Sequence, residues 1–242
     1  RMLKPIYQVY IHNVVRRSYI MASLVSDKMV VLSKSYVSSC AELSRCEYEK
    51  IIAIPNGFNV DDKVDGLFLN RKKLLYVGRL VETQKKISEL INIWKYLCEE
   101  FLDWDLLIVG DGPDKDVLIN KAKDISNIEF KGYQDPREYY EKASIFCMTS
   151  IFEGFPMCLT EAMQFGCVPI AFDSFSAVYD IIKPGETGEL VKSFDKKEYV
   201  GKLIHLIDDE TYRKKLSKNA FQYVKRYDIA NILPKWIELI EK

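Results

Sequence analysis

The chain has 242 residues, of which 48% are apolar and 29% charged, and acidic and basic side chains are equal in number at 35 each. This composition excludes a disordered or collagen-like chain, and the balanced charge argues against a dedicated nucleic-acid binder. Residues 1–36 nevertheless carry six Lys or Arg and one Asp, a net charge of +5. A solvated helix face would explain this excess, as would attraction to phosphates or to an anionic membrane surface.

Short apolar runs alternate with amphipathic segments along the chain. The predicted strands are 6–11, 28–32, 50–53, 73–78, 105–109, 127–130, 144–148, 167–171 and 188–191. The predicted helices are 86–102, 113–124, 135–143, 156–165, 195–208 and most of 210–242. Prolines are expected to open three of them, at Pro113, Pro156 and Pro234. This alternation predicts an α/β fold with a doubly wound parallel sheet.

The segment 55–71 interrupts this rhythm with two Gly, one Pro and several Asn and Asp, so we expect an interdomain linker. Residues 1–54 hold about three predicted strands, too few for a complete domain of this type. Residues 72–225 hold a full set and predict one complete domain. The final segment, 226–242, is expected to be a helix that packs back toward the N-terminal part.

Cysteine and histidine usage limits the chemistry. The six cysteines show no C-x-x-C spacing and four lie in apolar runs, which predicts reduced core residues of a cytosolic protein. Only His12 and His205 occur, so a His-based metal site is not expected. No apolar stretch reaches about 18 residues, and no signal peptide opens the chain. We therefore expect a cytoplasmic protein that needs no metal or other cofactor.

Ligands of an open parallel sheet bind at the carboxyl ends of its strands, so the loops there are candidate sites. Gly78 and Arg79 follow the strand 73–77, and Lys85 and Lys86 come just before a helix. An Arg fork and a Lys point charge suit a phosphate. The alternative is that Gly78 is only a turn residue and that the Arg and Lys side chains are solvated at the surface.

Three further loops belong to the same edge. Gly110 and Gly112 permit close backbone approach, either to a ligand or in an ordinary strand-to-helix turn. Tyr133 follows the strand 127–131, where a plain turn would explain it, and an exposed aromatic there could instead stack on a base. After the strand 144–148, the loop with Glu153 and Gly154 leads into a helix that carries Glu161. A helix start offers unpaired N–H groups to a diphosphate, and a carboxylate in so apolar a helix needs a hydrogen-bond partner.

Taken in order, these elements resemble the retaining glycosyltransferases of family 4, which have the two-domain GT-B architecture. The resemblance rests on seven elements in register, namely 54–59 (IPNGFN), 76–80 (YVGRL), 109–113 (VGDGP), 132–133 (GY), the Glu-x7-Glu element that spans 153–163, 166–170 (GCVPI) and 185–191 (GETGELV). It implies one complete Rossmann-like donor domain and only the last part, residues 1–54, of the acceptor-side domain.

The resemblance implies a role for each matching position. Arg79 and Lys85 match the pair that holds the donor diphosphate, and Lys86, where the family usually has Gly, could make the contact instead. The backbone amides of Phe155, Met157 and Cys158 match those that hold the donor diphosphate at the helix start. Pro156 lies among them but has no N–H to donate. The glycines of the donor loops are Gly78, Gly110, Gly112 and Gly154.

Other matches concern the sugar and the nucleoside. Glu153 matches the residue that contacts hydroxyls of the transferred sugar. Glu161 matches the residue that contacts the ribose hydroxyls. Tyr133 matches the base-binding edge. His12, expected just after the strand 6–11, resembles a first-domain His near the reaction centre, although capping a helix would explain it as well.

The implied function is transfer of a sugar, with retention, from a nucleotide diphosphate sugar to a polysaccharide or glycolipid, as in surface polysaccharide or capsule assembly. A UDP-sugar is the expected donor. No metal is expected. The family's basic side implies peripheral contact with the inner face of the membrane. Two alternatives remain open, a nucleotide-sugar-binding module that is inactive alone and a nucleotide-sugar epimerase.

Overall fold

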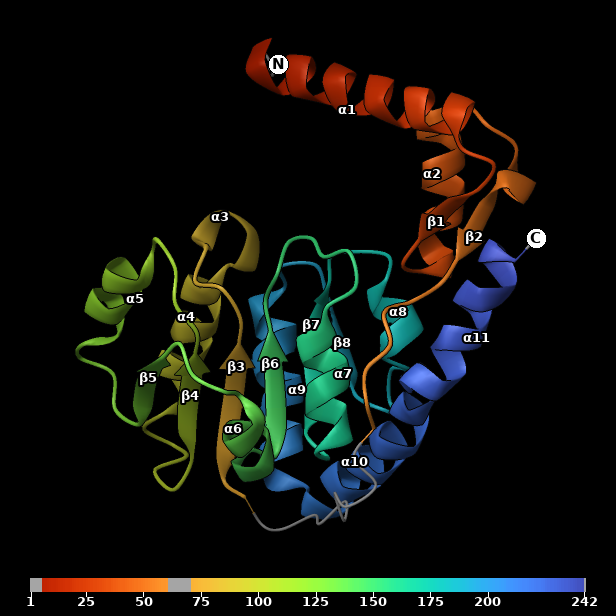
Figure 1. Ribbon diagram of the computed structural model, residues 1–242. Helices are drawn as coiled ribbons and strands as arrows, with labels where there is room; N and C mark the ends of the chain where they lie inside the picture. The colour runs from red at the N-terminus through yellow and green to blue at the C-terminus, as the bar shows by residue number, and fades with distance from the viewer. Residues whose placement is uncertain (1–5, 61–70, 242) are drawn as a thin grey trace.

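A six-stranded, fully parallel sheet organises the larger part of the molecule (Figure 1). The computed structural model describes residues 6–60 and 71–241, with the side chains of 14–60 and 71–241. The strand order is β5-β4-β3-β6-β7-β8, which is the order of a dinucleotide-binding doubly wound fold. The strands are β3 (Lys73–Val77), β4 (Asp105–Val109), β5 (Ile128–Gly132), β6 (Ile145–Met148), β7 (Val168–Asp173) and β8 (Glu189–Lys192). This arrangement confirms the predicted α/β fold.

Helices connect successive strands and cover both faces of the sheet (Figure 1). They are α3 (Glu82–Lys85), α4 (Ile87–Leu97), α5 (Lys115–Ala122), α6 (Arg137–Lys142), α7 (Met157–Gln164), α8 (Val178–Ile181), α9 (Lys196–Asp208) and α10 (Glu210–Val224). Side chains alternate along each strand, so Leu74 and Tyr76 join the core that contains Trp94 of α4, while Leu75 joins the core that contains Met163 of α7.

The N-terminal part forms a smaller unit. It consists of α1 (Ile6–Val25), β1 (Met29–Val31), the 3-10 helix η1 (Lys34–Tyr36), α2 (Val37–Ser44), the 3-10 helix η2 (Tyr48–Lys50) and β2 (Ile51–Ala53). Strands β1 and β2 pair in parallel and pack with Cys40 and Ala41 of α2. In Figure 1, α1 extends beside α2 and away from the six-stranded sheet.

The chain passes between the two parts twice. The first crossing follows β2, where Phe58 lies beside the junction of the 3-10 helix η3 (Lys225–Tyr227) and the last helix, α11 (Ile229–Ile240). Phe58 N–H donates to Tyr227 O at 3.1 Å, and Ile229 N–H donates to Phe58 O at 2.8 Å. Helix α11 then runs beside β2, and the two line a cavity of about 590 Å³ with Lys28 and Ile54. The rest of the predicted linker, 61–70, lies outside the described residues.

The predicted strand 6–11 is wrong, because these residues form the first turns of α1. Their β-rich composition is a weak prior that the surrounding chain overrides. Residues 6–25 contain neither Gly nor Pro, so nothing in this stretch stops a helix. His12 therefore lies within a helix and not after a strand, and the described residues before the linker form two strands instead of three.

Prolines do not open helices where the sequence predicts. Pro234 lies inside α11, which begins at Ile229 because the Asp228 carboxylate caps it by accepting from the N–H of Ala230. Pro156 is the N-cap residue of α7, and Pro113 lies in a turn that delays α5 to Lys115. The short helices α2, α3 and α8 were not predicted, since four to eight residues carry too little periodicity.

Candidate functional site

The strand order reverses between β3 and β6, so the connections that leave these neighbours turn to opposite faces of the sheet. A crevice at the carboxyl ends of two such strands is the usual ligand position in this class of fold. The loop after β3 carries Gly78 and Arg79, and the loop after β6 carries Glu153 and Gly154. Topology alone thus places the two loops singled out from the sequence side by side.

Glycines let the loops after β3 and β4 touch through their backbones. A Cβ on Gly110, at a φ of +141°, would lie 1.9 Å from Gly78 O, and one on Gly112 would lie 2.3 Å from Leu80 O. Side chains at these positions would therefore overlap the neighbouring main chain. Gly154 differs, because a Cβ there would meet only Leu32 Cδ1, at 3.9 Å.

A groove of about 740 Å³ opens along these loops. Its walls include Gly78, Arg79, Gly110 and Tyr133. The Tyr133 ring is 88% exposed, so its face is available to a flat ligand. Arg79 is exposed, whereas its carbonyl accepts from the Tyr76 hydroxyl at 3.2 Å, which fixes the backbone of the loop.

Lys85 and Glu153 form an ion pair at the crevice, with Nζ and Oε1 2.5 Å apart. Both side chains are largely buried, at 17% and 9% exposure. A buried pair is costly to desolvate, and breaking it leaves an uncompensated charge. Lys86 has a left-handed backbone, φ +49°, at the junction of α3 and α4, and forms no ion pair with a described carboxylate. The geometry thus separates the two lysines that the sequence left open.

Backbone contacts hold the Glu153 loop in place. Ile151 N–H donates to Gln84 O at 2.8 Å, and the Thr149 hydroxyl donates to Lys85 O at 2.9 Å. From the N-terminal part, the Tyr36 hydroxyl donates to Glu153 O. The carboxylate-bearing loop is therefore fixed both to α3 and to the smaller unit.

Glu161 has the hydrogen-bond partner that its apolar helix requires. The Tyr140 hydroxyl donates to Glu161 Oε2 at 2.9 Å. Burial first, and then the nearby Cys158 and Glu161, raises the pKa of Tyr140 well above its usual value, so the phenol stays protonated as a donor. One carboxylate oxygen of Glu161 is thereby oriented, which leaves the other for a ligand.

The charged groups of the site converge on the start of α7. Burial raises the pKa of the Cys158 thiol to about 12, with further increases from Glu153 and Glu161 and an opposing effect from Lys85. All three charges are therefore near one thiol in the first turn. No described side chain caps the helix, and Leu159 N–H donates to Pro156 O at 3.1 Å, so the N–H groups of Met157 and Cys158 remain for an outside acceptor.

The structure thus assembles the predicted residues into a groove, a buried ion pair and an uncapped helix start. His12 is in α1, and its side chain lies outside the described part of the structure. Sequence reasoning missed Tyr140 and Tyr36, which orient Glu161 and the Glu153 loop. Neither tyrosine has a local signal, because the two contacts span 21 and 117 residues.

Membrane-spanning helices, metal-binding clusters and disulfides are all absent from the described residues. No described helix is long and apolar enough to cross a membrane. Within 6–60 and 71–241, His, Cys, Asp and Glu side chains do not gather in a group that could hold a metal ion. All six cysteines are free thiols, and Cys40, Cys98, Cys147 and Cys167 are buried.

Solved structures share this fold. TarM of S. aureus, in complex with UDP and other ligands, superposes with a TM-score of 0.85 at 22% identity, covering 93% of this chain and 46% of TarM. HepE of Anabaena, in complex with UDP and glucose, gives 0.82 at 17% identity, covering 95% and 67%. At these identities the likeness shows the fold alone, and it supports the predicted GT-B architecture.

Curated relatives show the family. The amylovoran biosynthesis glycosyltransferase AmsD of Erwinia amylovora is 32% identical over 234 residues, which cover 93% of this chain and 65% of AmsD. An N-acetylgalactosaminyltransferase of Campylobacter jejuni that acts on an undecaprenol-linked glycan is 29% identical over 79% of this chain and 54% of its own length. The chain thus spans about half to two thirds of such relatives. The sequence profile described as Glycosyl transferases group 1 matches residues 58–223, and the chain therefore belongs to that glycosyltransferase family.

Proposed function

We propose that this chain supplies the donor side of a glycosyltransferase that moves a sugar, with retention, from a UDP-sugar to a glycolipid or polysaccharide acceptor. The observation that carries the proposal is the Lys85–Glu153 pair and the uncapped start of α7 at the switch point of the sheet, where the loop after β3 also carries Arg79. Support also comes from relatives named for amylovoran biosynthesis and for undecaprenol-linked acceptors.

The described geometry suggests how a donor would bind. The base stacks near Tyr133 in the groove, and Glu161 accepts from ribose hydroxyls with the oxygen that Tyr140 leaves free. The diphosphate lies against Arg79, Lys85 and the first turn of α7. Glu153 accepts from a hydroxyl of the transferred sugar, while its ion pair with Lys85 offsets its repulsion of the phosphates.

Bond cleavage at the anomeric carbon places negative charge on the leaving diphosphate. Fixed cations and helix-start dipoles that face this charge stabilise the transition state more than the ground state. Arg79 and Lys85 fill this role, so we propose that the reaction needs no metal ion. We assign no protein nucleophile. The reaction takes place at the inner face of the membrane, where a lipid-linked acceptor would be presented.

Calorimetry with UDP tests the donor site. Glu161→Ala and Arg79→Ala are each expected to weaken UDP binding by about 1–3 kcal/mol, the usual loss for a charged hydrogen bond. Glu99→Ala and Arg17→Ala remove matched charges at exposed positions elsewhere and should leave the affinity unchanged. A chelator should have no effect. Unchanged affinity in both site variants would contradict the assignment.

Glu153→Gln separates the sugar from the nucleotide. Losing the carboxylate frees Lys85 for the phosphates, so UDP should bind as well as before or more tightly, whereas the UDP-sugar loses its hydroxyl contact and binds more weakly. Equal losses for both ligands would refute the role of Glu153. If UDP binds but no acceptor is glycosylated, the chain acts as a nucleotide-sugar-binding module that is inactive alone.

A further inference from the structure

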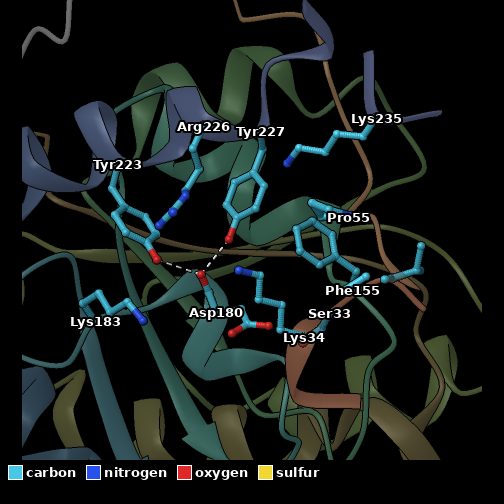
Figure 2. Close-up of a pocket in the computed structure, with 12 residues that line it drawn as sticks. Ser33, Lys34, Pro55, Phe155, Asp180, Lys183, Tyr223, Arg226, Tyr227 and Lys235 are labelled. Atoms are coloured by element: carbon cyan, nitrogen blue, oxygen red, sulfur yellow. Dashed lines mark hydrogen bonds between the residues drawn. The ribbon is translucent and has the colours of Figure 1, made fainter. Parts of the chain in front are cut away.

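A second, strongly basic pocket lies at the junction of the two parts of the molecule (Figure 2). It has a volume of about 250 Å³ and shares no lining residue with the groove of Gly78 and Tyr133. Its walls come from η1 (Lys34), the chain just after α8 (Lys183), η3 (Arg226) and α11 (Lys235). Four cations from separate elements therefore share one small cavity.

Acidic side chains do not neutralise this cluster. Asp180 is the single carboxylate in the lining, and it accepts from the Ser33 hydroxyl and, at 3.5 Å, from the Ser35 N–H. Within the part of the chain that the structure describes, none of the four cations forms an ion pair with an acidic residue. The lining thus carries a net charge of about +3 in a chain whose overall charge is zero.

Aromatic contacts hold two of the cations in place. The Arg226 guanidinium lies over the Tyr223 ring, 4.6 Å from its centroid, and Lys183 Nζ lies 6.0 Å from the same centroid. Tyr223 is itself fixed, because its hydroxyl donates to Asp180 O at 2.9 Å, as the Tyr227 hydroxyl does at 2.6 Å (Figure 2). A guanidinium held flat in this way keeps its planar edge for a ligand.

The two remaining cations reach in from the facing walls. Figure 2 shows the Lys34 and Lys235 side chains extending toward the space beside Tyr227. No described polar group accepts a hydrogen bond from either ammonium. Lys183 donates one bond to Tyr179 O at 2.8 Å, which leaves two of its N–H groups for another acceptor. The pocket therefore offers many donors and very few acceptors.

We propose that this junction pocket binds a phosphate group, gripped by the Arg226 fork and by the ammonium groups of Lys34, Lys183 and Lys235. Arg and Lys around a concave surface are the groups that recognise phosphate oxygens. The volume is below the range of about 300–1,000 Å³ typical of drug-sized ligands, which favours a small anion over a whole nucleotide sugar. Because the walls come from both parts, a bound phosphate ties η1 to α11. The pocket borders the donor site at Phe155, but none of its four cations belongs to that site.

Pyrophosphate titrations on paired variants test this proposal. Lys34→Gln with Arg226→Gln removes two charges from the junction pocket, and Arg79→Gln with Lys85→Gln removes two from the donor site. Lys121→Gln with Lys123→Gln removes two exposed charges on and just after α5. We expect calorimetry to show two classes of pyrophosphate site in the unmodified chain. The junction variant loses one class, with at least about tenfold weaker binding, and keeps UDP binding, whereas the α5 control keeps both.

The donor variant provides the reciprocal result, because it should lose UDP binding and keep pyrophosphate at the junction. Failure of the proposed function alone would leave the junction class intact. A single pyrophosphate class that only the donor variant removes would overturn the proposal, as would junction binding that survives Lys34→Gln with Arg226→Gln. Thermal unfolding without ligand confirms that each variant is folded.

A vesicle assay distinguishes the two sources of such a phosphate. Vesicles of phosphatidylcholine with phosphatidylglycerol are sedimented with the unmodified chain and with the junction variant. Loss of vesicle binding in that variant, together with its loss of pyrophosphate, identifies a lipid headgroup. Loss of pyrophosphate binding with no difference in vesicle binding identifies a free phosphate. Equal binding of the two proteins in both assays would contradict the proposal.

Discussion

Glycine acts differently at two positions that look alike in the sequence. Gly110 and Gly154 both follow strands at the carboxyl edge and both resemble ligand-approach residues. The structure shows that Gly110 is required by the Gly78 carbonyl of the neighbouring loop, while the Cα of Gly154 faces open space with only Leu32 nearby. A sequence can predict that a loop needs glycine, but which atom comes close depends on a neighbouring strand.

This contrast predicts that substitution by alanine changes stability at Gly110 and ligand binding at Gly154. Gly110→Ala should lower the free energy of unfolding by about 2–4 kcal/mol, because its Cβ would overlap a backbone oxygen at 1.9 Å. Gly154→Ala should leave stability within about 0.5 kcal/mol and weaken UDP-sugar binding instead. Urea denaturation and calorimetry measure the two effects.

Gly201, in the middle of α9, provides the control. A Cβ there meets nothing within 4 Å, so Gly201→Ala should raise stability by about 0.5–1 kcal/mol through helix propensity. If Gly110→Ala unfolds at the same urea concentration as the unmodified chain, the close contact between the two loops is wrong.

At the scale of the element, Arg213 joins two helices. It lies in α10 and is 5% exposed, and its Nη1 donates to Leu206 O at 2.5 Å and to Ile207 O at 2.9 Å, at the end of α9. Its guanidinium also lies over Trp104, 5.2 Å from the ring centroid. The last carbonyls of a helix lack internal partners, so a buried cation from the next helix satisfies them.

Arg213→Leu should therefore lower the free energy of unfolding by about 2–4 kcal/mol, since two buried carbonyls lose their charged donor. Lys215→Leu, at an exposed position of the same helix, is the matched control and should change stability by less than about 0.5 kcal/mol. Urea denaturation compares them. Equal midpoints for the two variants would show that Arg213 does not cap α9.

The sequence predicts the strands of the large sheet more accurately than the first and last helices. All six strands of the large sheet were found within one or two residues, because strands buried on both faces read as continuous apolar runs between turns. Residues 6–11 were misassigned because a short apolar run does not distinguish strand from helix. The start of α11 was missed because Asp228, held beside Phe58, caps the helix before Pro234.

At the scale of the whole molecule, the parallel alternation of strands and helices allows the position of the site to be predicted, but not the contacts between the two parts. The parallel alternation predicted that the functional loops share one edge, and the structure places them there. Contacts between the two parts could not be predicted in this way. The Tyr36–Glu153 bond and the junction pocket both depend on how residues 28–58 dock on the larger sheet, which no local pattern encodes.

Tyrosines buried throughout the molecule predict how its stability depends on pH. Burial raises the pKa of Tyr76, Tyr140, Tyr199 and Tyr227 above the usual value of about 10. Above that pH the unfolded chain loses phenol protons that the folded chain retains. The unfolded state then binds fewer protons, so the free energy of unfolding is fully maintained below pH 10 and falls as the pH rises beyond it.

We therefore expect the urea midpoint to decrease steeply between pH 10 and 11, and tyrosinate absorbance from these four residues to appear only on unfolding. Tyr140→Phe removes one raised group and should make the alkaline decrease shallower, although it lowers stability at neutral pH by leaving Glu161 without its donor. A midpoint that stays constant to pH 11 would mean that these phenols are not buried in the native structure. An unchanged slope in Tyr140→Phe would remove Tyr140 from the titrating set.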